Sequence, residues 1–345
     1  MNHPIDHLVQ DVQAGNGRAT RAAAQLMTAM IDVPHRLADL LAGSDAWPQP
    51  RLVLGVTGAP GSGKSTLVDH LTAELRNRYP QRKVGIIAVD PSSPFTGGAL
   101  LGDRVRMMRH ASDPGVFIRS LATRGRLGGV ALGVRGVIRV MGLAGCEVVI
   151  VETVGVGQSE VEIAQNADLV AVVLAPGQGD SVQMLKAGLM EAGDLFVVNK
   201  SDREGAAQLR AQLLATIALS AKARGELQGP FSERDSAPLA YSCSAVNHTG
   251  IAELVEAIEA MATERGAEWR DRRKRQLLDE VRQAVMETAV RRFAHALRLH
   301  GAEEPRLRQI LRGEVSLDQF VDGILRETVA AERPQTVHLS QGSPS

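Results

Sequence analysis

Apolar residues recur near helical spacing in the first part of the chain. Between residues 1 and 47 they lie within a stretch rich in alanine, leucine, methionine and arginine. We therefore predict a helical N-terminal extension over residues 1–47. It ends at Trp47-Pro48-Gln49-Pro50, where two prolines interrupt the helical pattern. The apolar positions are Leu8, Val12, Leu26, Met30 and Leu37.

Short continuous apolar runs of strand length follow from residue 48 onward. Segments with helical character, such as Ser65–Tyr79, lie between these runs. Alternating strands and helices predict an α/β domain with a mostly parallel sheet and helices on both of its faces, and we place it at residues 48–262. Ligands of such a domain bind at the carboxyl ends of its strands. The predicted strands are Leu52–Val56, Val84–Val89, Glu147–Val151, Leu169–Leu174, Leu195–Val198 and Leu239–Tyr241.

A charged helix is predicted in the C-terminal part of the chain. Over residues 269–300, apolar residues recur every three to four positions and form an amphipathic stripe. The stripe either packs back on the core or pairs with another subunit, and both alternatives stay open. We predict a helical C-terminal arm over residues 263–331 and a disordered tail over residues 332–345. The basic run Arg270–Arg275 is interpreted as a solvated helix face, with a partner-binding surface as the alternative.

The composition is that of an ordinary globular protein. Lys and Arg number 39, as do Asp and Glu, and 44% of residues are hydrophobic, so we expect neither a nucleic-acid nor a membrane partner. The two cysteines, Cys146 and Cys243, lie beside apolar runs and are predicted to be buried rather than paired. The longest apolar stretch, residues 129–151, is interrupted by two arginines and a glutamate, and the N-terminus does not resemble a secretory signal. A cytoplasmic location is expected.

A glycine-rich segment connects the first predicted strand to the following helix. It reads G-A-P-G-S-G-K-S and matches the phosphate-binding pattern G-x-x-x-x-G-K-[ST], which predicts the P-loop NTPase form of the α/β fold. Its backbone N–H groups would face the phosphates, and Lys64 would neutralise β- and γ-phosphate oxygens. Ser65 would offer a hydroxyl to Mg²⁺, and a chance glycine-rich turn is the alternative. The predicted nucleotide contacts are Gly58, Ala59, Pro60, Gly61, Ser62, Gly63, Lys64, Ser65 and Thr66.

Carboxylates follow two of the predicted strands. Glu152 comes directly after an apolar run, where nucleotide hydrolases place the acid that holds Mg²⁺, and Gly155 can approach the γ-phosphate with its N–H. Asp90 and Asp103 flank a turn-rich segment that can change shape when a γ-phosphate arrives, so they are candidates for binding Mg²⁺ or orienting water. A helix cap for Glu152 and a rigid structural loop at Asp90–Arg104 are the alternatives.

The sequence N-K-S-D after the strand at 195–198 predicts the choice of base. Asp202 can accept hydrogen bonds from guanine N1–H and from the 2-amino group, whereas adenine offers that carboxylate only a lone pair at N1. Lys200 would lie along the ring, and Asn199 would bind the phosphate loop and approach N7. Ser244-Ala245 fits the remaining position, where Ala245 N–H can meet O6. We therefore predict GTP and GDP as ligands, with a helix-capping turn as the alternative.

These motifs together resemble a known family. The phosphate loop, the guanine motif, D-P-S-S-P-F-T-G-G-A-L-L-G-D-R (Asp90–Arg104) and E-T-V-G-V-G-Q-S-E (Glu152–Glu160) are similar to the MeaB, ArgK and MMAA group of SIMIBI-class P-loop GTPases. Members of that group chaperone adenosylcobalamin-dependent acyl-CoA mutases. The resemblance covers roughly residues 53–258. It implies a homodimeric GTPase and metallochaperone that binds a mutase, gates cobalamin loading and protects or reactivates the enzyme.

The resemblance also implies roles for single residues. Besides Lys64, it assigns the Mg²⁺ and catalytic set to Ser65, Asp90, Asp103 and Glu152. A mobile loop at residues 177–186 would bring Lys186 to the phosphates, and a solvated helix residue is the alternative for Lys186. The residues to which the resemblance assigns a role in Mg²⁺ binding or catalysis, besides Lys64, are thus Ser65, Asp90, Asp103, Glu152 and Lys186.

One departure from other GTPases affects the expected rate. Val156 follows Gly155, at the position where Ras-like enzymes carry the glutamine that positions water. We therefore expect intrinsic hydrolysis to be slow and to be stimulated by a partner. Gln158 is a candidate substitute for that glutamine. The client stays open among methylmalonyl-, isobutyryl-, 2-hydroxyisobutyryl- and ethylmalonyl-CoA mutase. Alternative functions are a GTPase for nickel-centre assembly, an ArgK-like transport-associated kinase or ATPase, and a GTP-locked scaffold without turnover. The guanine motif argues against the ATP-dependent alternative.

Overall fold

The chain forms two compact units, residues 1–277 and residues 278–345, in a computed structural model. Each unit is described by itself. The structure describes residues 6–15, 18–32, 47–90, 108–110, 112–122, 129–153, 166–177, 193–223, 240–266, 269, 271–278, 281–282, 285–286, 308–316, 318–323 and 326.

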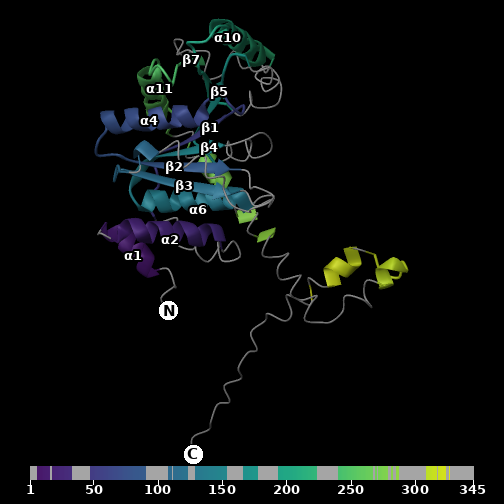
Figure 1. Ribbon diagram of the computed structural model, residues 1–345. Coiled ribbons are helices and arrows are strands. Elements are labelled where there is room, and N and C mark those ends of the chain that lie inside the picture. The colour runs from purple at the N-terminus through teal and green to yellow at the C-terminus, as the bar shows by residue number, and fades with distance from the viewer. Residues whose placement is uncertain are drawn as a thin grey trace, which may run out of the picture. The chain divides into compact units, whose positions relative to one another are not determined.

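A seven-stranded sheet forms the centre of the first unit (Figure 1). Its strands are β1 (Leu52–Gly58), β2 (Lys83–Asp90), β3 (Val116–Ala122), β4 (Cys146–Thr153), β5 (Leu169–Leu174), β6 (Leu195–Val198) and β7 (Ala240–Ser242). The order is β3-β2-β4-β1-β5-β6-β7, and every neighbouring pair is parallel. The carboxyl ends of β1, β4, β6 and β7 therefore point to one edge of the sheet, which is where the predicted site residues lie.

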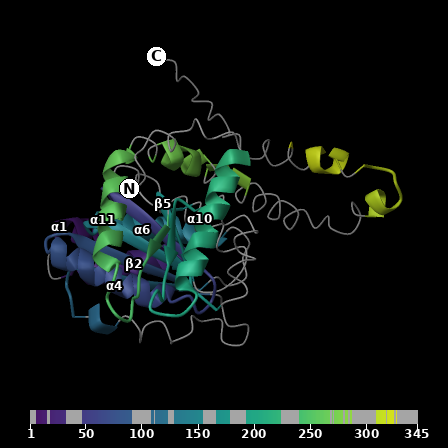
Figure 2. The ribbon, with the colours of Figure 1, turned by 90° about the horizontal axis from the view of Figure 1, so that it is seen from above.

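Helices cover both faces of this sheet. They are α1 (Asp6–Ala14), α2 (Ala19–Asp32), α4 (Lys64–Arg78), α6 (Gly129–Leu143), α10 (Ala206–Ala223) and α11 (Ile251–Glu264). On one face α4 and α11 pack against each other (Figure 2). On the other face α6 packs on β3 and β4, and α2 packs on α6 as a further layer (Figure 1). The predicted α/β fold with helices on both faces of a parallel sheet is confirmed.

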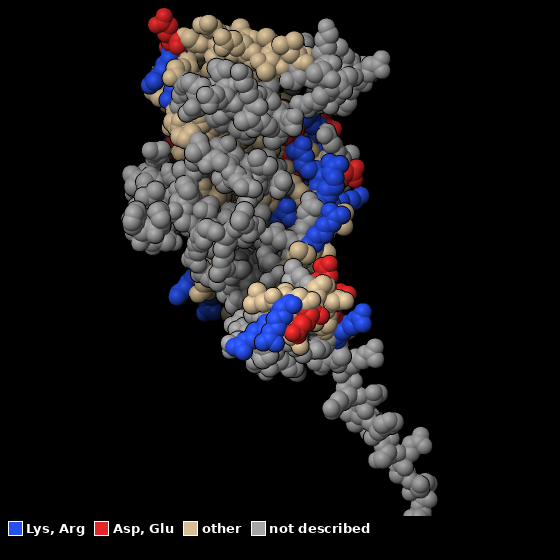
Figure 3. Space-filling model, turned by 90° about the vertical axis from the view of Figure 1, so that its right-hand side faces the viewer, with Lys and Arg blue, Asp and Glu red and all other residues tan. Residues whose placement is uncertain are grey.

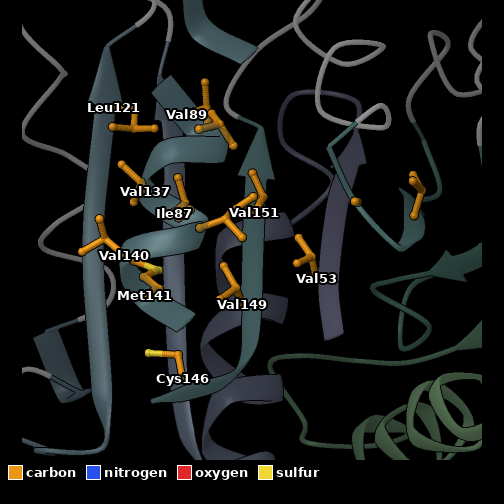
Figure 4. Close-up of a cluster of buried hydrophobic side chains, with 14 of the residues drawn as sticks. Val53, Ile87, Val89, Leu121, Val137, Val140, Met141, Cys146, Val149 and Val151 are labelled. Atoms are coloured by element: carbon orange, nitrogen blue, oxygen red, sulfur yellow. The ribbon is translucent and has the colours of Figure 1, made fainter. Parts of the chain in front are cut away.

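Two hydrophobic clusters lie on opposite sides of the sheet. Because side chains alternate along a strand, Val149 and Val151 of β4 face one cluster, while Val148 and Ile150 face the other. Figure 4 shows the first cluster, in which Ile87 and three valines of β2 and β4 meet the side chains of α6. Cys146 is buried there, and burial raises the pKa of its thiol to about 12.

Cys243 lies in the second cluster, and burial raises the pKa of its thiol to about 12 as well. Both cysteines are free and buried, as predicted. At neutral pH each is therefore a neutral thiol that packs as a small apolar side chain.

The strand β3 was not predicted, and α6, like α10 and α11, was not named among the expected helices. β3 is an edge strand whose residues Val116–Ser120 are only partly buried, so its sequence lacks a continuous apolar run. α6 contains four glycines, which lower its helix propensity, and it is apolar on most sides because it is covered by both the sheet and α2. A Cβ at Gly142 would lie 2.3 Å from the carbonyl oxygen of Pro48, so this glycine allows the connector before β1 to cross α6 closely.

Three described side chains at the start of the predicted C-terminal arm pack within the first unit. Trp269 is buried in the cluster with α4 and α11. Arg273 Nη2 lies 2.5 Å from Oδ2 of Asp168, a carboxylate that also accepts a 2.8 Å hydrogen bond from Val53 N. Arg272 Nη1 lies 3.0 Å from Asp194 Oδ2. The interpretation of this basic run as a solvated helix face is therefore wrong for Arg272 and Arg273.

The second unit is described in short helical stretches. Residues 318–323 are helical and begin with a capping box. Ser316 Oγ accepts a 3.2 Å hydrogen bond from Gln319 N, and Gln319 Oε1 accepts one of 3.1 Å from Ser316 N. This pair satisfies two backbone donors that a helix start would otherwise leave open.

Basic and acidic side chains lie next to each other on the described surface that Figure 3 shows. Among the described helices, none is long and apolar enough to span a bilayer.

Candidate functional site

The phosphate loop connects β1 to α4, as its motif predicts. Three of its glycines have positive φ angles, 141° at Gly58, 75° at Gly61 and 89° at Gly63. Gly63 directly precedes the first residue of α4, so the open N–H groups of that helix lie at the end of the loop. The loop and the helix start together offer backbone donors and a partial positive charge to an anion.

Gly58 cannot carry a side chain without moving the sheet. A Cβ at this position would lie 2.1 Å from the carbonyl oxygen of Val173 in β5, and the φ angle of 141° is strained for any L side chain. We expect Gly58→Ala to lower the free energy of unfolding by at least about 2 kcal/mol. Urea titration followed by circular dichroism measures this change.

Gly133→Ala in α6 is the matched control for that prediction. A Cβ at Gly133 meets no atom within 4 Å, so its replacement is expected to leave stability unchanged or raise it by up to about 1 kcal/mol. Equal unfolding midpoints for the two variants would contradict the close approach of the loop to β5.

Lys64 lies within the loop and is only 6% exposed. Its Nζ donates hydrogen bonds to the carbonyl oxygens of Gly58, at 2.6 Å, and of Ala59, at 3.1 Å. A buried ammonium group needs compensation, and these loop carbonyls supply part of it. The positive charge is therefore held where the loop would enclose phosphate oxygens.

Ser65 and Glu152 meet next to the start of α4. Ser65 Oγ donates a 2.5 Å hydrogen bond to Glu152 Oε1, and both residues are buried. The parallel register that pairs Val56 of β1 with Glu152 of β4 brings the carboxylate to this point. A hydroxyl and a carboxylate are hard oxygen ligands, so the pair fits the coordination chemistry of Mg²⁺.

Asn199 joins the guanine motif to the phosphate loop. Its Nδ2 donates a 2.9 Å hydrogen bond to the carbonyl oxygen of Ser62, and its Oδ1 accepts one of 3.2 Å from Ala245 N. A Cβ at Gly63 would lie 2.5 Å from Asn199 Nδ2, so the glycine also makes room for this side chain. Lys200 adds a second link, because its Nζ donates a 2.6 Å hydrogen bond to Gly61 O.

Asp202 lies beside Ser244, which the sequence places in a different segment. Pairing of Val198 in β6 with Ser242 in β7 brings the two segments to the same edge of the sheet. Ser244 Oγ donates a hydrogen bond to Asp202 Oδ1. This bond, followed by one from the residue's own backbone N–H, holds the pKa of Asp202 below its ordinary value. The exposed carboxylate is therefore ionised at neutral pH and can only accept hydrogen bonds.

The predicted guanine-loop position is a closed turn. Ser244 N donates to Thr249 O at 2.9 Å, and Thr249 N donates back to Ser244 O at 3.2 Å. Asn247 N donates a 3.3 Å hydrogen bond to Ser244 Oγ. We call residues 244–250 the guanine loop, and these bonds hold its two ends together.

The structure thus brings the phosphate loop, Glu152, the N-K-S-D motif and Ser244-Ala245 to the same edge of the sheet. Thr66 lies exposed in the first turn of α4. The backbone of Asp90 ends β2, but its side chain lies outside the described residues. Asp103, Gly155 and Lys186 also lie outside them, so their assigned roles stay predictions.

Two residues near the site were not predicted from the sequence. Asp69 and His70 follow the phosphate loop in α4, and both contact segments that lie far away in the chain. The only signal in the sequence was a carboxylate four residues after Ser65, on the face of α4 that is otherwise buried.

Comparison with known proteins extends the likeness over most of the chain. Residues 42–298 match the family model described as methylmalonyl Co-A mutase-associated GTPase MeaB. A Pyrococcus abyssi protein named "Putative GTPase" is 38% identical over 327 residues, which is 94% of this chain and 97% of that protein. The GTPase ArgK of Escherichia coli is 41% identical over 207 residues, 60% of each chain.

Two further proteins match either over a smaller part of the chain or at a lower sequence identity. The mitochondrial methylmalonic aciduria type A homolog of Caenorhabditis briggsae is 40% identical over 168 residues, 49% of this chain and 40% of that protein. A crystal structure of a LAO/AO transport system kinase superposes with a TM-score of 0.59 at 26% identity, covering 96% of this chain and 98% of the other. With the family model matched over residues 42–298 and a phosphate loop, acidic strand end and guanine motif in one site, the chain belongs to the MeaB family of P-loop GTPases.

Proposed function

We propose that this GTPase acts as a metallochaperone that gates the loading of adenosylcobalamin into a B12-dependent acyl-CoA mutase, and that it protects or reactivates that enzyme. The observation that carries the proposal is the match of residues 42–298 to a family model of mutase-associated GTPases. The relatives named for methylmalonic aciduria support it. Methylmalonyl-CoA mutase is the first client to test, followed by isobutyryl-, 2-hydroxyisobutyryl- and ethylmalonyl-CoA mutase.

The phosphate end of the site would bind and polarise the triphosphate. Lys64 and the backbone donors at the start of α4 would hold the β- and γ-phosphates, and the loop would exclude water from them. Ser65 and Glu152, which already meet, would hold Mg²⁺, and Asp90 and Asp103 are proposed to complete the set or to orient the attacking water. Mg²⁺ would supply neutralisation of the negative charge on the phosphate oxygens.

The base end of the site would select guanine. The ionised Asp202 would accept hydrogen bonds from N1–H and the 2-amino group. Ala245 N–H, which donates to Asn199 Oδ1, would share its hydrogen with O6 of the base. Lys200 would cover the ring. Because Asn199 contacts both the phosphate loop and the guanine loop, it would keep the two ends at a fixed separation. Binding of the correct base would therefore also position the phosphates.

Assembly as a homodimer and a role for Lys186 belong to the same proposal. The described helical residues between positions 277 and 286 carry exposed apolar side chains at three- to four-residue spacing, which supports pairing of the arm with another subunit. Lys186 would reach the phosphates when the partner binds. The exposed apolar residues are Leu277, Leu278, Val281, Val285 and Met286.

The experiment that tests the proposal is GTP hydrolysis by the purified protein, alone and with each of the four mutases. We expect slow intrinsic turnover and stimulation of at least about 10-fold by one mutase, because partner-supplied groups can accelerate GTP hydrolysis by several orders of magnitude. Lys64→Ala with the same mutase is the control for contaminating GTPase activity. Unchanged turnover with all four mutases would contradict the proposal and favour a scaffold that binds GTP without stimulated hydrolysis.

A transport-associated kinase is the second candidate, because the solved structure that superposes over 96% of the chain carries that title. Such a kinase would transfer the γ-phosphoryl group to a protein acceptor instead of to water. The position of Asp202 beside Ser244 favours GTP over ATP. Radiolabelled phosphate that appears on a protein acceptor, and not as free phosphate, would favour the kinase.

A further inference from the structure

Five ionisable side chains from three segments meet beside the guanine loop. Asp69 and His70 belong to α4, and Arg109 and His110 belong to the short 3-10 helix η3 (Met108–His110). His248 belongs to the guanine loop. None of these residues has a role in the nucleotide site as described above, and their contacts link that loop to the helix that begins at the phosphates.

Asp69 is the centre of this cluster. Its Oδ1 lies 2.7 Å from Arg109 Nε and 2.9 Å from His110 Nε2, and both Asp69 and His110 are buried. His110 Nε2 also lies 3.0 Å from the backbone oxygen of Asp69. Arg109 Nε lies 3.3 Å from the same nitrogen, so the guanidinium contacts both the carboxylate of Asp69 and the imidazole of His110. The carboxylate therefore fixes the guanidinium of Arg109 next to α4.

Arg109 in turn determines the protonation of His70. Arg109 Nη2 lies 3.2 Å from His70 Nδ1, and a guanidinium group can only donate hydrogen bonds. His70 Nδ1 must therefore be an unprotonated acceptor, which makes the imidazole neutral with its proton on Nε2. Burial, and then the charges of Arg109 and His248, lower the pKa of His70, while Asp69 opposes the shift and His110 adds to it slightly.

The neutral ring of His70 contacts the guanine loop. Its centroid lies 4.2 Å from that of His248, and the two rings are nearly perpendicular, at 83°. This is the edge-to-face arrangement that aromatic rings favour. His248 has a positive φ angle of 56° within the turn closed by Ser244 and Thr249, and Ser244 holds Asp202. The turn that carries His248 is therefore the same turn whose Ser244 holds Asp202, the residue that would recognise the base.

We propose that His70 is a positioning residue for guanine binding: its neutral imidazole holds His248 and the guanine loop against α4, and its protonation weakens the binding of guanine nucleotides. A protonated His70 would place N–H against the Arg109 guanidinium and add a positive charge beside His248 and His110, with Asp69 as the only opposing charge among the five side chains. The proposal rests on the nucleotide site described under the proposed function.

The sign of the pH dependence follows from linkage. Because the pKa of His70 is lower in the folded loop contact than its ordinary value of 6.5, the contact contributes fully above about pH 6.5 and is lost as the pH falls below that value. Asp202 does not titrate in this range, since its pKa is held below 3.8. The affinity for GDP should therefore decrease on acidification, and part of this decrease should accompany the protonation of His70.

The test is the Kd of GDP, measured by calorimetry from pH 5.5 to pH 7.5 for the wild-type chain and for His70→Gln. Glutamine keeps an acceptor for Arg109 but does not titrate. We expect the wild-type affinity to fall at least about threefold more than that of the variant over this range. The reason is linkage: because the loop contact disfavours protonation of His70, protonation of His70 disfavours the loop contact and the nucleotide binding that depends on it. Protonation of the GDP phosphates is common to both proteins and cancels in the comparison.

Two further variants complete the design. His7→Gln, on the exposed part of α1, is the matched control and should keep the wild-type pH profile. His248→Asn removes the other ring with a residue that tolerates the positive φ angle, and should weaken GDP binding at pH 7.5 and flatten the profile. Coinciding profiles for the wild type and His70→Gln, with tight binding at pH 7.5, would overturn the role of His70 alone. Absence of GDP binding by the wild type would overturn the nucleotide site and this role together.

Discussion

Lys64→Ala is expected to reduce GTP turnover at least about 100-fold, because it removes the buried positive charge from the loop that would enclose the phosphates. The ammonium group is already held in the loop by the carbonyl oxygens of Gly58 and Ala59, so its position is fixed before the nucleotide binds. Loss of the charge should weaken both the ground-state complex and the transition state. Phosphate release and calorimetric binding of GDP measure the two effects separately.

Lys274→Ala is the control for this experiment. Its side chain is 77% exposed and pairs with Asp271 on the helix surface, so its removal should leave turnover within about twofold of the wild type. If Lys64→Ala and Lys274→Ala hydrolysed GTP equally fast, the phosphate site would lie elsewhere on the molecule.

Asp202→Asn is expected to change the preferred base from guanine to xanthine. The asparagine Oδ1 can keep the hydrogen bond from Ser244 Oγ, which leaves Nδ2 to face the base. An N–H₂ group opposes the N1–H and 2-amino donors of guanine but pairs with the 2-carbonyl oxygen of xanthine. The ratio of kcat/KM for GTP to that for XTP should fall at least about 100-fold, because sites built on hydrogen bonds discriminate strongly against a mismatched donor.

Glu204→Gln is the matched control for Asp202→Asn. Glu204 lies two residues further along the chain and is exposed, and its neutralisation removes the same charge from the same turn. It should leave the GTP to XTP ratio unchanged. Retention of GTP selectivity by Asp202→Asn would show that another group reads the base.

Much of the sheet was predictable because its strands are buried on both faces. β1, β5 and β6 consist of buried residues throughout, and their sequences are continuous apolar runs that end close to where the structure ends them. β3 could not be found in this way, since this edge strand is only partly buried over Val116–Ser120 and contains Arg119 and Ser120. α6 was missed because burial by tertiary neighbours overrides its low helix propensity.

The candidate site was predictable where backbone geometry requires particular residues. The glycines and Lys64 of the phosphate loop, and the N-K-S-D motif, carry their function in local sequence. The contacts between segments were not predictable in the same way. Asn199 binding to Ser62 O, Arg273 binding to Asp168 and the cluster around Asp69 each depend on where distant parts of the chain meet.

The central claim is that the phosphate loop, the N-K-S-D motif and the guanine loop form one site for guanine nucleotides. The most direct measurement is a calorimetric titration of the wild-type chain with GDP and with ADP in the presence of Mg²⁺. We predict that GDP binds at least about 100-fold more tightly than ADP, because Asp202 can pair only with the guanine edge. Equal affinities for the two nucleotides, or tighter binding of ADP, would contradict the claim.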